Sequence, residues 1–537
     1  MIITKMKHTS KLSVLACGIL FAGSSVFCSC TDKFEQWNIN PDEVTPDMMD
    51  TDNLKTGALY SQMQRGVFVV GQDLGGTYQI HQMLNADNYA GYFANIKDSY
   101  DIGNRHSDHY NMVSKWFTLP FDDTYPNIMQ PCKQIFENSD EGSMDRAMAT
   151  VVKVFGMHRL TDKYGPIPYS KFGTDIAVAY DAQQDIYNQF FTELDQAIET
   201  MLTYVASGST NYLARYDNVY LGNVNKWLKF ANTLRLRLAM RISYVDEAKA
   251  RTEIQKALDS EAGLMASTSD DAVFHNNTNA FSFTNPIWEV TQSFNDMRMG
   301  ATMDVYLNGL QDPRRAAYFT AVNGEYHGMR NGMTSGFAQM AATTSAANFE
   351  SESDLPWMRA AEAYFLQAEA KLRFGLGNGD VKDLYEQGIR TSMASNNVNS
   401  GVDAYIANST NTPSTSWVNP ANSQSVNVSA WVSTLPVAWD DSANTEKKLE
   451  RIITQKWIAL YPDGQEAWSE MRRTGYPGWV RIATYASASG VSDNDLIRRI
   501  QFSTTELSNN SANVQDAIKL LGGQDNAGTR LWWDVKR

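Results

Sequence analysis

The sequence predicts an all-α protein in which pairs of helices form a spine and long loops form a second face. Apolar residues recur at helical spacing in four pairs of segments, and long inserts separate those pairs. The inserts cover residues 264–349 and 396–441, and Ser, Thr, Asn and Gly dominate residues 396–432. A long irregular insert inside a compact fold is usually a functional or a mobile loop.

The chain is organised around the helical hairpin predicted at residues 446–479. Its first helix carries one apolar stripe, formed by Leu449, Ile452, Ile453, Trp457 and Leu460. Pro462 ends this helix, and Asp463 with Glu466 is expected to form a capping box that starts the next one. The second helix ends at Gly475. The apolar stripes of this hairpin need another hairpin to bury against.

Further helices are predicted earlier in the chain: one over residues 56–83, then pairs at 146–160 with 186–205, 224–242 with 246–258, and 357–374 with 380–393. Alanines at positions 360–370 allow helices of the last pair to approach closely. Paired helices of this kind resemble tetratricopeptide-like units, although they are too widely spaced for a continuous solenoid. We therefore expect a helical spine that carries loops on its other face.

Composition excludes one class of partner. The 537-residue chain has a formal net charge of −14, whereas proteins that bind nucleic acid carry basic patches. Its 13 Trp and 25 Tyr residues are a large aromatic supply. We expect about two-thirds of these rings to fill the core, and the others are free to form stacking surfaces for sugars or other flat ligands.

The N-terminus predicts secretion and a lipid anchor. Residues 1–29 combine a basic start with an apolar run over 12–27 that is too short for a membrane span. Ser29 precedes Cys30, which resembles a bacterial lipobox; an ordinary secretory signal is the alternative. We expect a signal peptide at 1–29, a lipidated tether at 30–54 and a single helical domain at 55–537. Loss of three lysines with the signal takes the charge from −14 to −17, and Cys132 remains as a small buried hydrophobe.

No catalytic, metal or cofactor motif appears in the sequence. His106 and His109 lie near each other without a further ligand at recognisable spacing. Arg235, Arg237 and Arg241 are more simply explained as partners of carboxylates than as an anion site. A carboxylate pair for glycoside hydrolysis stays open, because its members need only be close in space.

Aromatic residues in polar, turn-forming sequence are the candidates for ligand contact. The predicted contact residues are Tyr89, Tyr92, Tyr100, Trp116, Trp288 and Arg298. Trp417 and Trp431, in the second insert, are further candidates. For the group at residues 88–116, the alternative is that these rings cover a neighbouring helix.

Four motifs carry a family resemblance. They are CTDKFEQWNINP from residue 30, TDKYGPIPY at 161–169, KWLKFANTLRLRLAMR at 226–241, and GQEAW followed by RRTGYP at 464–477. They are similar to motifs of the SusD/RagB family, and this resemblance covers most of residues 30–480. None of the candidate contact residues is taken from these motifs.

The resemblance implies a function as well as a fold. It implies a surface lipoprotein of the outer membrane that binds a glycan and delivers it to a SusC-like TonB-dependent transporter, without enzymatic activity. Peptide capture, as on the RagB side of the family, is the alternative, and an all-α glycoside hydrolase or lyase is a third reading.

Overall fold

The structure, a computed structural model, describes residues 53–97 and 107–536. Within it, Lys55–Arg537 form one compact unit. The predicted signal peptide, the lipidation site Cys30, nearly all of the tether and the candidate Tyr100 lie outside the described residues.

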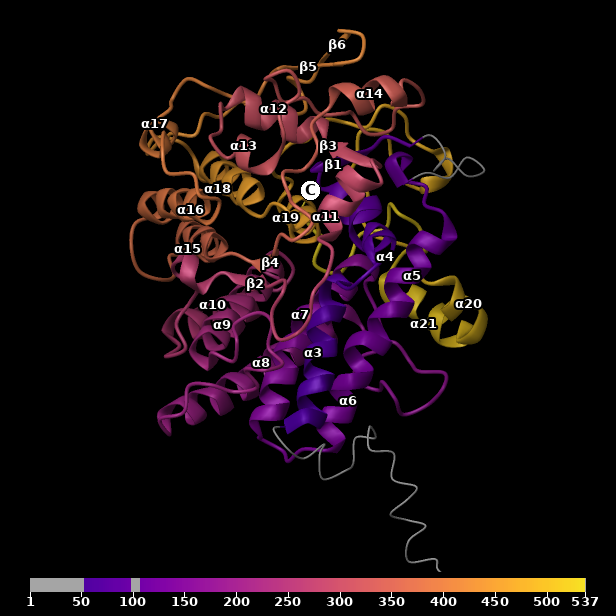
Figure 1. Cartoon of the computed structure of the whole chain (residues 1–537), viewed down its shortest axis with the longest axis vertical. Coiled ribbons are helices and arrows are strands. Elements are labelled where there is room, and N and C mark those ends of the chain that lie inside the picture. The colour runs from indigo at the N-terminus through magenta and orange to yellow at the C-terminus, as the bar shows by residue number, and fades with distance from the viewer. Residues whose placement is uncertain (1–52, 98–106, 537) are drawn as a thin grey trace, which may run out of the picture. The chain divides into compact units, whose positions relative to one another are not determined.

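The four predicted helix pairs are confirmed, and together they form the spine. They are α7 (Met144–Tyr164) with α8 (Gln183–Ala206), α9 (Val224–Arg241) with α10 (Glu247–Asp259), α15 (Ala360–Phe374) with α16 (Val381–Ser395), and α18 (Thr445–Ala459) with α19 (Gly464–Thr474). Each pair contacts the next: α8 contacts α9, α9 contacts α15, and α15 contacts α18 (Figure 1). The helices therefore make one continuous stack, even though long inserts separate them in sequence.

The stripes predicted from helical spacing are the surfaces that these helices bury. Leu449, Ile452, Ile453 and Trp457 are all buried. Asp463 caps α19 by accepting a hydrogen bond from the backbone NH of Glu466. The predicted capping box is only half right, because the Glu466 side chain turns away from the cap and binds a buried arginine on α9.

The helices before the spine differ from the prediction. A single helix over 56–83 is wrong: α3 (Leu54–Phe68) ends early, and α4 (Gly75–Tyr78) and the π-helical segment η2 (Gln79–Asp87) follow a turn. Val69 and Asp73 in this turn have positive φ angles of 53° and 56°. A Cβ on Gly75 would meet the carboxylate of Glu289 at 2.2 Å. The break is therefore set by a contact with a segment more than 200 residues away.

Between this turn and the spine lie α5 (Ser114–Thr124), η5 (Tyr125–Met129) and α6 (Gln130–Glu137). The chain ends with α20 (Thr504–Asn509) and α21 (Ser511–Leu521). Cys132 in α6 is buried, as predicted, and burial raises the pKa of its thiol to about 12.

The inserts contain short elements joined by loops. The described strands form three antiparallel ladders, which pair β1 (Phe93–Asn95) with β3 (Met297–Met299), β2 (Ala272–Phe274) with β4 (Leu355–Met358), and β5 (Ser416–Val418) with β6 (Ser425–Asn427). Short helices between them are α11 (Pro286–Trp288), η7 (Glu289–Ser293), α12 (Ala301–Gly309), α13 (Arg315–Tyr318), α14 (Phe337–Thr343) and α17 (Val402–Ile406).

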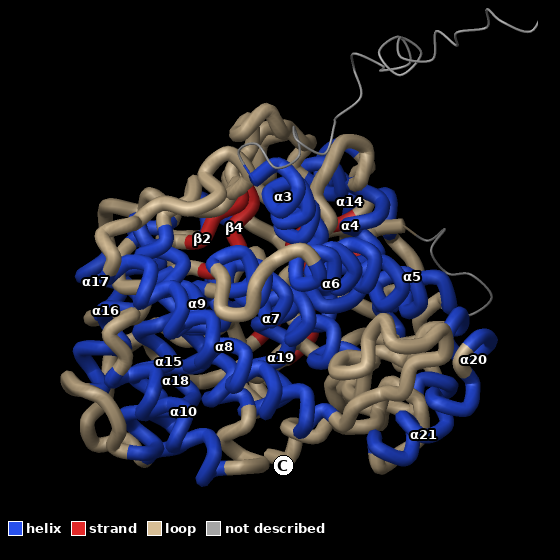
Figure 2. The backbone as a smooth tube through the Cα atoms, turned by 90° about the horizontal axis from the view of Figure 1, so that it is seen from below, coloured by secondary structure: helices blue, strands red, loops and turns tan. Residues whose placement is uncertain are grey.

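The predicted fold class is confirmed: helices dominate, strands are few and short, and loops carry much of the remaining chain (Figure 2). Within residues 53–97 and 107–536, no helix combines the length and the apolar character needed to cross a membrane.

Candidate ligand-binding surface

Three of the predicted contact residues lie in the core. Tyr89, Tyr92 and Trp116 are buried. The ring centroid of Tyr89 lies 5.3 Å from that of Trp468, and the ring centroid of Tyr92 lies 5.3 Å from that of Trp457. The Tyr92 hydroxyl donates a hydrogen bond to the Trp457 backbone carbonyl. In this structure Tyr89 and Tyr92 therefore pack against helices of the spine, which was the alternative.

The remaining candidates divide into one accessible ring and two structural side chains. Trp288, at the end of α11, is half-buried. Arg298 donates hydrogen bonds to the backbone carbonyls of Thr291 and Met297, so it holds the turn between η7 and β3. Trp417 is buried, and its indole NH donates to a backbone carbonyl at 2.8 Å. Of these three, only Trp288 offers a ring to solvent.

Two arginines and three aromatic rings meet in the loop-rich part of the molecule. We call Arg330, Trp431, Trp479, Arg481 and Tyr485 the Arg–Trp cluster; all five are half-buried. The Arg330 guanidinium lies 5.4 Å from the Trp431 ring centroid, and the Arg481 guanidinium lies 3.6 Å from that of Trp479. The backbone carbonyl of Arg481 accepts a hydrogen bond from Arg330 Nε at 2.7 Å, so the two stacked pairs are neighbours.

Three segments that are distant in sequence hold this cluster. The Tyr306 hydroxyl, on α12, donates to the Gly478 carbonyl at 2.9 Å and accepts from the Ser433 NH at 3.0 Å. A Cβ on Gly478 would meet the Trp431 carbonyl oxygen at 2.2 Å, so the segments that carry Trp431 and Trp479 approach too closely for a larger residue. The third segment joins through the Ala483 NH, which donates to a carbonyl at position 331.

Several polar atoms of the cluster are unsatisfied. Trp479 Nε1 and Arg481 Nε and Nη1 are buried without a hydrogen-bond partner in the described structure. Buried donors are almost always paired, so each such group needs an explanation, of which an absent ligand or ion is one. Burial lowers the pKa of both Arg330 and Arg481, and burial raises the pKa of Tyr485 to about 12 against the effect of Arg481.

Sequence reasoning found one ring of this cluster and missed the rest. Trp431 is the predicted member, since it lies in the second insert. Arg330, Trp479, Arg481 and Tyr485 carry no local signal, although Trp479 is the last residue of the hairpin that organises the chain.

A separate groove lies between η5, the loop before α8, and α20. Its cavity of about 480 Å³ is lined by Phe121, Tyr125 and Phe172 and by carboxylates, which belong to Asp122, Asp175 and Glu506. The Tyr125 and Phe172 rings stack with centroids 5.5 Å apart. The lining contains no arginine or lysine, so this groove suits a cationic ligand.

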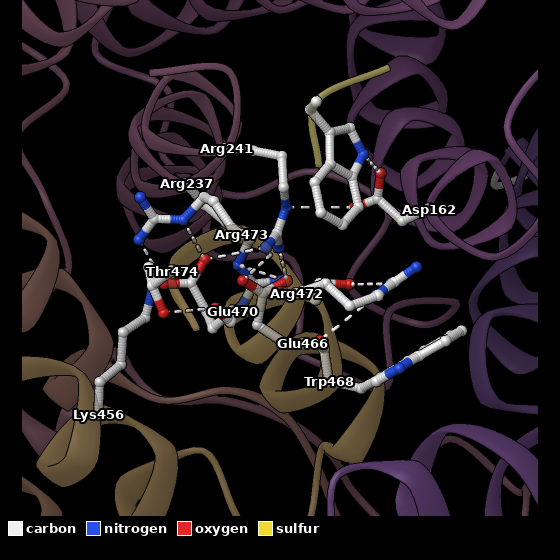
Figure 3. Close-up of polar contacts among 12 residues, drawn as sticks. Asp162, Arg237, Arg241, Lys456, Glu466, Trp468, Glu470, Arg472, Arg473 and Thr474 are labelled. Carbon is white, nitrogen blue, oxygen red and sulfur yellow. Dashed lines mark hydrogen bonds and ion pairs between the residues drawn. The ribbon is translucent and has the colours of Figure 1, made fainter. Parts of the chain in front are cut away.

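The largest polar constellation is a buried ion network of the spine (Figure 3). Arg237 contacts Glu362 through two hydrogen bonds, and Arg241 contacts Glu466 and Glu470. Arg235 contacts Asp195 at the spine surface. All three arginines therefore pair with carboxylates, as predicted.

This ion network joins the spine helices. Arg241 Nε on α9 lies 3.3 Å from Asp162 of α7, and Arg473 of α19 lies 2.6 Å from Glu369 of α15. The members named here are almost fully covered by protein, so the network has no access for a substrate. Within the described ranges no group of His, Cys, Asp and Glu side chains is arranged to hold a metal ion.

Comparison with known proteins agrees with this architecture. A family model described as SusD-like, Susd and RagB outer membrane lipoprotein, matches residues 36–534. A chitin-binding SusD homologue from Flavobacterium johnsoniae is 37% identical, with a TM-score of 0.84, over 90% of this chain and 99% of that one. SusD homologues from Bacteroides uniformis (34% identity, TM-score 0.81, 90% and 100% covered) and Bacteroides thetaiotaomicron (32%, 0.82, 90% and 99%) are also similar.

A search among curated proteins found no match. The family match nevertheless spans nearly the whole chain, and it includes the spine and both inserts. The chain therefore belongs to the SusD/RagB family of outer membrane lipoproteins.

Proposed function

We propose that this protein captures an oligosaccharide at the outer face of the outer membrane and delivers it to a SusC-like TonB-dependent transporter. Family membership supports nutrient binding by a lipoprotein, and the relative from Flavobacterium johnsoniae binds chitin. In this proposal Cys30 carries the lipid anchor and residues 31–54 are the tether.

The Arg–Trp cluster is the observation that carries the proposal. Trp431 and Trp479 are half-buried tryptophans held side by side by Tyr306, and partly exposed aromatic rings are surfaces on which sugar rings stack. Their positions are set by backbone contacts between three segments, which gives the largely preformed site that ligand binding favours. We place a second contact at Trp288, the accessible ring on α11.

The proposed role is binding and not hydrolysis. Glycosidases place two carboxyl groups about 5 to 9.5 Å apart across the scissile bond. The Arg–Trp cluster presents guanidinium groups and indoles, and Asp495, an acidic side chain whose charge acts on Arg481, already bonds Arg498. A cluster with this chemistry can orient a sugar, but it supplies no general acid.

The acidic groove favours a second candidate, peptide capture. Its aromatic walls and its three carboxylates suit a segment with a lysine or arginine beside an apolar side chain. Ile176, at its edge, is fully exposed, as residues of a protein contact often are. The groove attracts cations and the Arg–Trp cluster attracts anions. The charge of the ligands that bind therefore distinguishes the two functions.

Calorimetry on residues 31–537 with oligosaccharide and oligopeptide panels tests the proposal. We expect saturable glycan binding without product, weakened at least about tenfold by Trp431→Ala and to a smaller extent by Trp288→Ala. Trp439→Ala is the matched control, because Trp439 is also half-buried under a cation, Lys448 at 5.8 Å, but packs on Tyr385 of α16. Binding of peptides alone, lost in Phe172→Ala, would transfer the function to the groove.

A further inference from the structure

We propose that the Arg–Trp cluster selects glycans that carry an anionic group, and that Arg330 and Arg481 bind that group. The ligand class is an oligosaccharide with a carboxylate or a sulfate. This inference rests on the proposed function, because it names the substrate class of the same site.

The two arginines carry positive charge that no described carboxylate pairs with. Neither guanidinium has a carboxylate within 4.0 Å among the described residues, although the protein has 60 acidic side chains. By contrast, Arg237, Arg241 and Arg473 of the ion network each contact at least one carboxylate. In an acidic protein, two adjacent cations without a counter-charge make a local positive site, and such a site attracts an anion.

Asp495, whose charge acts on Arg481, does not neutralise this site. Asp495 is the carboxylate that acts on Arg481 through its charge, and that interaction is weaker than the effect of burial. Its Oδ1 already accepts a hydrogen bond from Arg498 Nη2 at 2.5 Å. Tyr485 faces both arginines, and because its pKa is about 12 it is neutral at physiological pH. Among residues 53–97 and 107–536, the positive charge of Arg330 and Arg481 therefore remains for a ligand.

The guanidinium groups also have hydrogen-bond donors to spare. Arg330 donates from Nε and Nη2 to the carbonyls of Arg481 and Ile482, at 2.7 and 3.2 Å, which fixes its orientation and leaves Nη1. Arg481 makes no side-chain hydrogen bond within the described ranges, and its Nε and Nη1 are covered by protein. An arginine that turns from this state toward an anion gains charge-assisted bonds without losing any, and carboxylates and sulfates accept such bonds in pairs.

The aromatic rings of the cluster favour a sugar as the carrier of the anionic group. A free inorganic anion would use only the guanidinium groups, whereas Trp431, Trp479 and Tyr485 add ring surface beside them. Sugars with a free amine are disfavoured, because two cations repel a third. A neutral sugar can stack on the rings but leaves the unpaired donors of Arg481 unsatisfied. A sugar with an acidic group can bind the guanidinium groups and stack on the aromatic rings at the same time.

The test is calorimetry on residues 31–537, which include the whole compact unit, with pairs of oligosaccharides that differ only in charge. One pair is oligogalacturonate and its methyl ester, a second is a sulfated oligosaccharide and its desulfated form, and a third is a chitin oligosaccharide and its deacetylated form. We expect the anionic member to bind at least about tenfold more tightly than its neutral partner, with an affinity that falls as salt rises. The cationic, deacetylated member is expected to bind most weakly.

Substitutions of Arg330 and Arg481 test whether these residues cause the preference for anionic oligosaccharides. Arg481→Gln should remove most of the preference for the anionic member, because it should weaken binding of that member far more than binding of the neutral partner, and Arg330→Gln should act in the same direction. Arg481→Lys keeps the charge and should retain part of the preference. Arg251→Gln is the control: Arg251 also stacks on an aromatic ring, that of Phe374 at 4.7 Å, but it pairs with a carboxylate on α10.

Each outcome decides the inference. Equal affinity for the charged and neutral members, or equal losses for both in Arg481→Gln, would overturn it while the proposed glycan function stands. No binding of any glycan would overturn the proposed function itself. Arg330 also holds two backbone carbonyls, so if Arg330→Gln fails to fold, the comparison of Arg481→Gln with Arg481→Lys decides the question alone.

Discussion

Replacing Glu470 by glutamine should destabilise the protein more than almost any other single isosteric change. Glu470 lies at the centre of the buried ion network, where its carboxylate contacts three cations. It lies 2.9 Å from Arg241, 3.0 Å from Lys456 and 2.7 Å from Arg473. Glutamine has nearly the same shape but no charge, so the change removes one negative charge and keeps the packing.

The size of the effect depends on which carboxylates still pair with the three cations after the substitution. Arg241 keeps Glu466 and Asp162, and Arg473 keeps Glu369, but Lys456 keeps only Glu362 at 3.8 Å. Removing one partner of a buried ion pair typically costs about 3 to 5 kcal/mol, because a charge is left in a medium that solvates it poorly. We expect a loss of about 4 kcal/mol in the free energy of unfolding of Glu470→Gln.

Urea unfolding followed by circular dichroism measures this loss, and thermal unfolding provides a second reading. An unfolding entropy of about 2 cal/mol/K per residue converts about 4 kcal/mol into a fall in Tm of roughly 4 °C for a domain of this size. Glu247→Gln is the control, because Glu247 pairs with Arg251 at 2.7 Å on the exposed face of α10, and it should cost about 0.5 kcal/mol. If Glu470→Gln loses no more than this control, the network is not a stabilising element.

Other predictions follow from the same structure. Burial raises the pKa of Glu470, but Arg473, Lys456 and Arg241 together hold it well below its usual value, so its contribution is present above the unfolded pKa of about 4.3 and is lost on acidification. Tm should fall steeply from pH 5 to about pH 3, and less steeply in Glu470→Gln. The buried Cys132 thiol, with a pKa of about 12, should not react with a thiol reagent at about pH 8 until the protein unfolds. Gly388→Ala should cost about 1–3 kcal/mol in urea unfolding, because its Cβ would lie 2.8 Å from the Phe365 ring.

The spine was predictable because its signal is local. An amphipathic helix repeats its apolar residues every three or four positions, and the stripe from Leu449 to Trp457 is buried as that spacing indicates. The turn after α3 was missed, although Gly71, Gly75 and Gly76 are local turn signals, and the close approach of Gly75 to Glu289 comes from the fold. Apolar residues continue at helical spacing through residues 69–74, although the helix ends at Phe68.

The candidate site was predicted less well than the fold, for a reason visible at Tyr89 and Tyr92. Their polar neighbours suggested an exposed segment, but Asn85, Asp87 and Asn88 are buried as well. Asn88, for example, bonds Asp108 and a residue of another loop. The polar residues around Tyr89 and Tyr92 form buried hydrogen bonds and do not mark an exposed surface. A single sequence does not distinguish these two roles.

The Arg–Trp cluster was missed for a different reason, which is that its residues come from separate parts of the chain. Arg330, Trp431 and Trp479 come from three loops, each separated from the next by tens of residues. Their approach depends on Tyr306 and on the small volume of Gly478. No pattern within a single segment reports that kind of contact, so Trp431 was predicted only as one ring in a long insert.

A crystal structure of the protein with the oligosaccharide that binds it most tightly tests the central claim most directly. The account predicts a sugar ring against Trp431 or Trp479, with an acidic group of the ligand bonded to Arg330 or Arg481. A ligand in the groove of Phe121, Tyr125 and Phe172, with the Arg–Trp cluster empty, would contradict it.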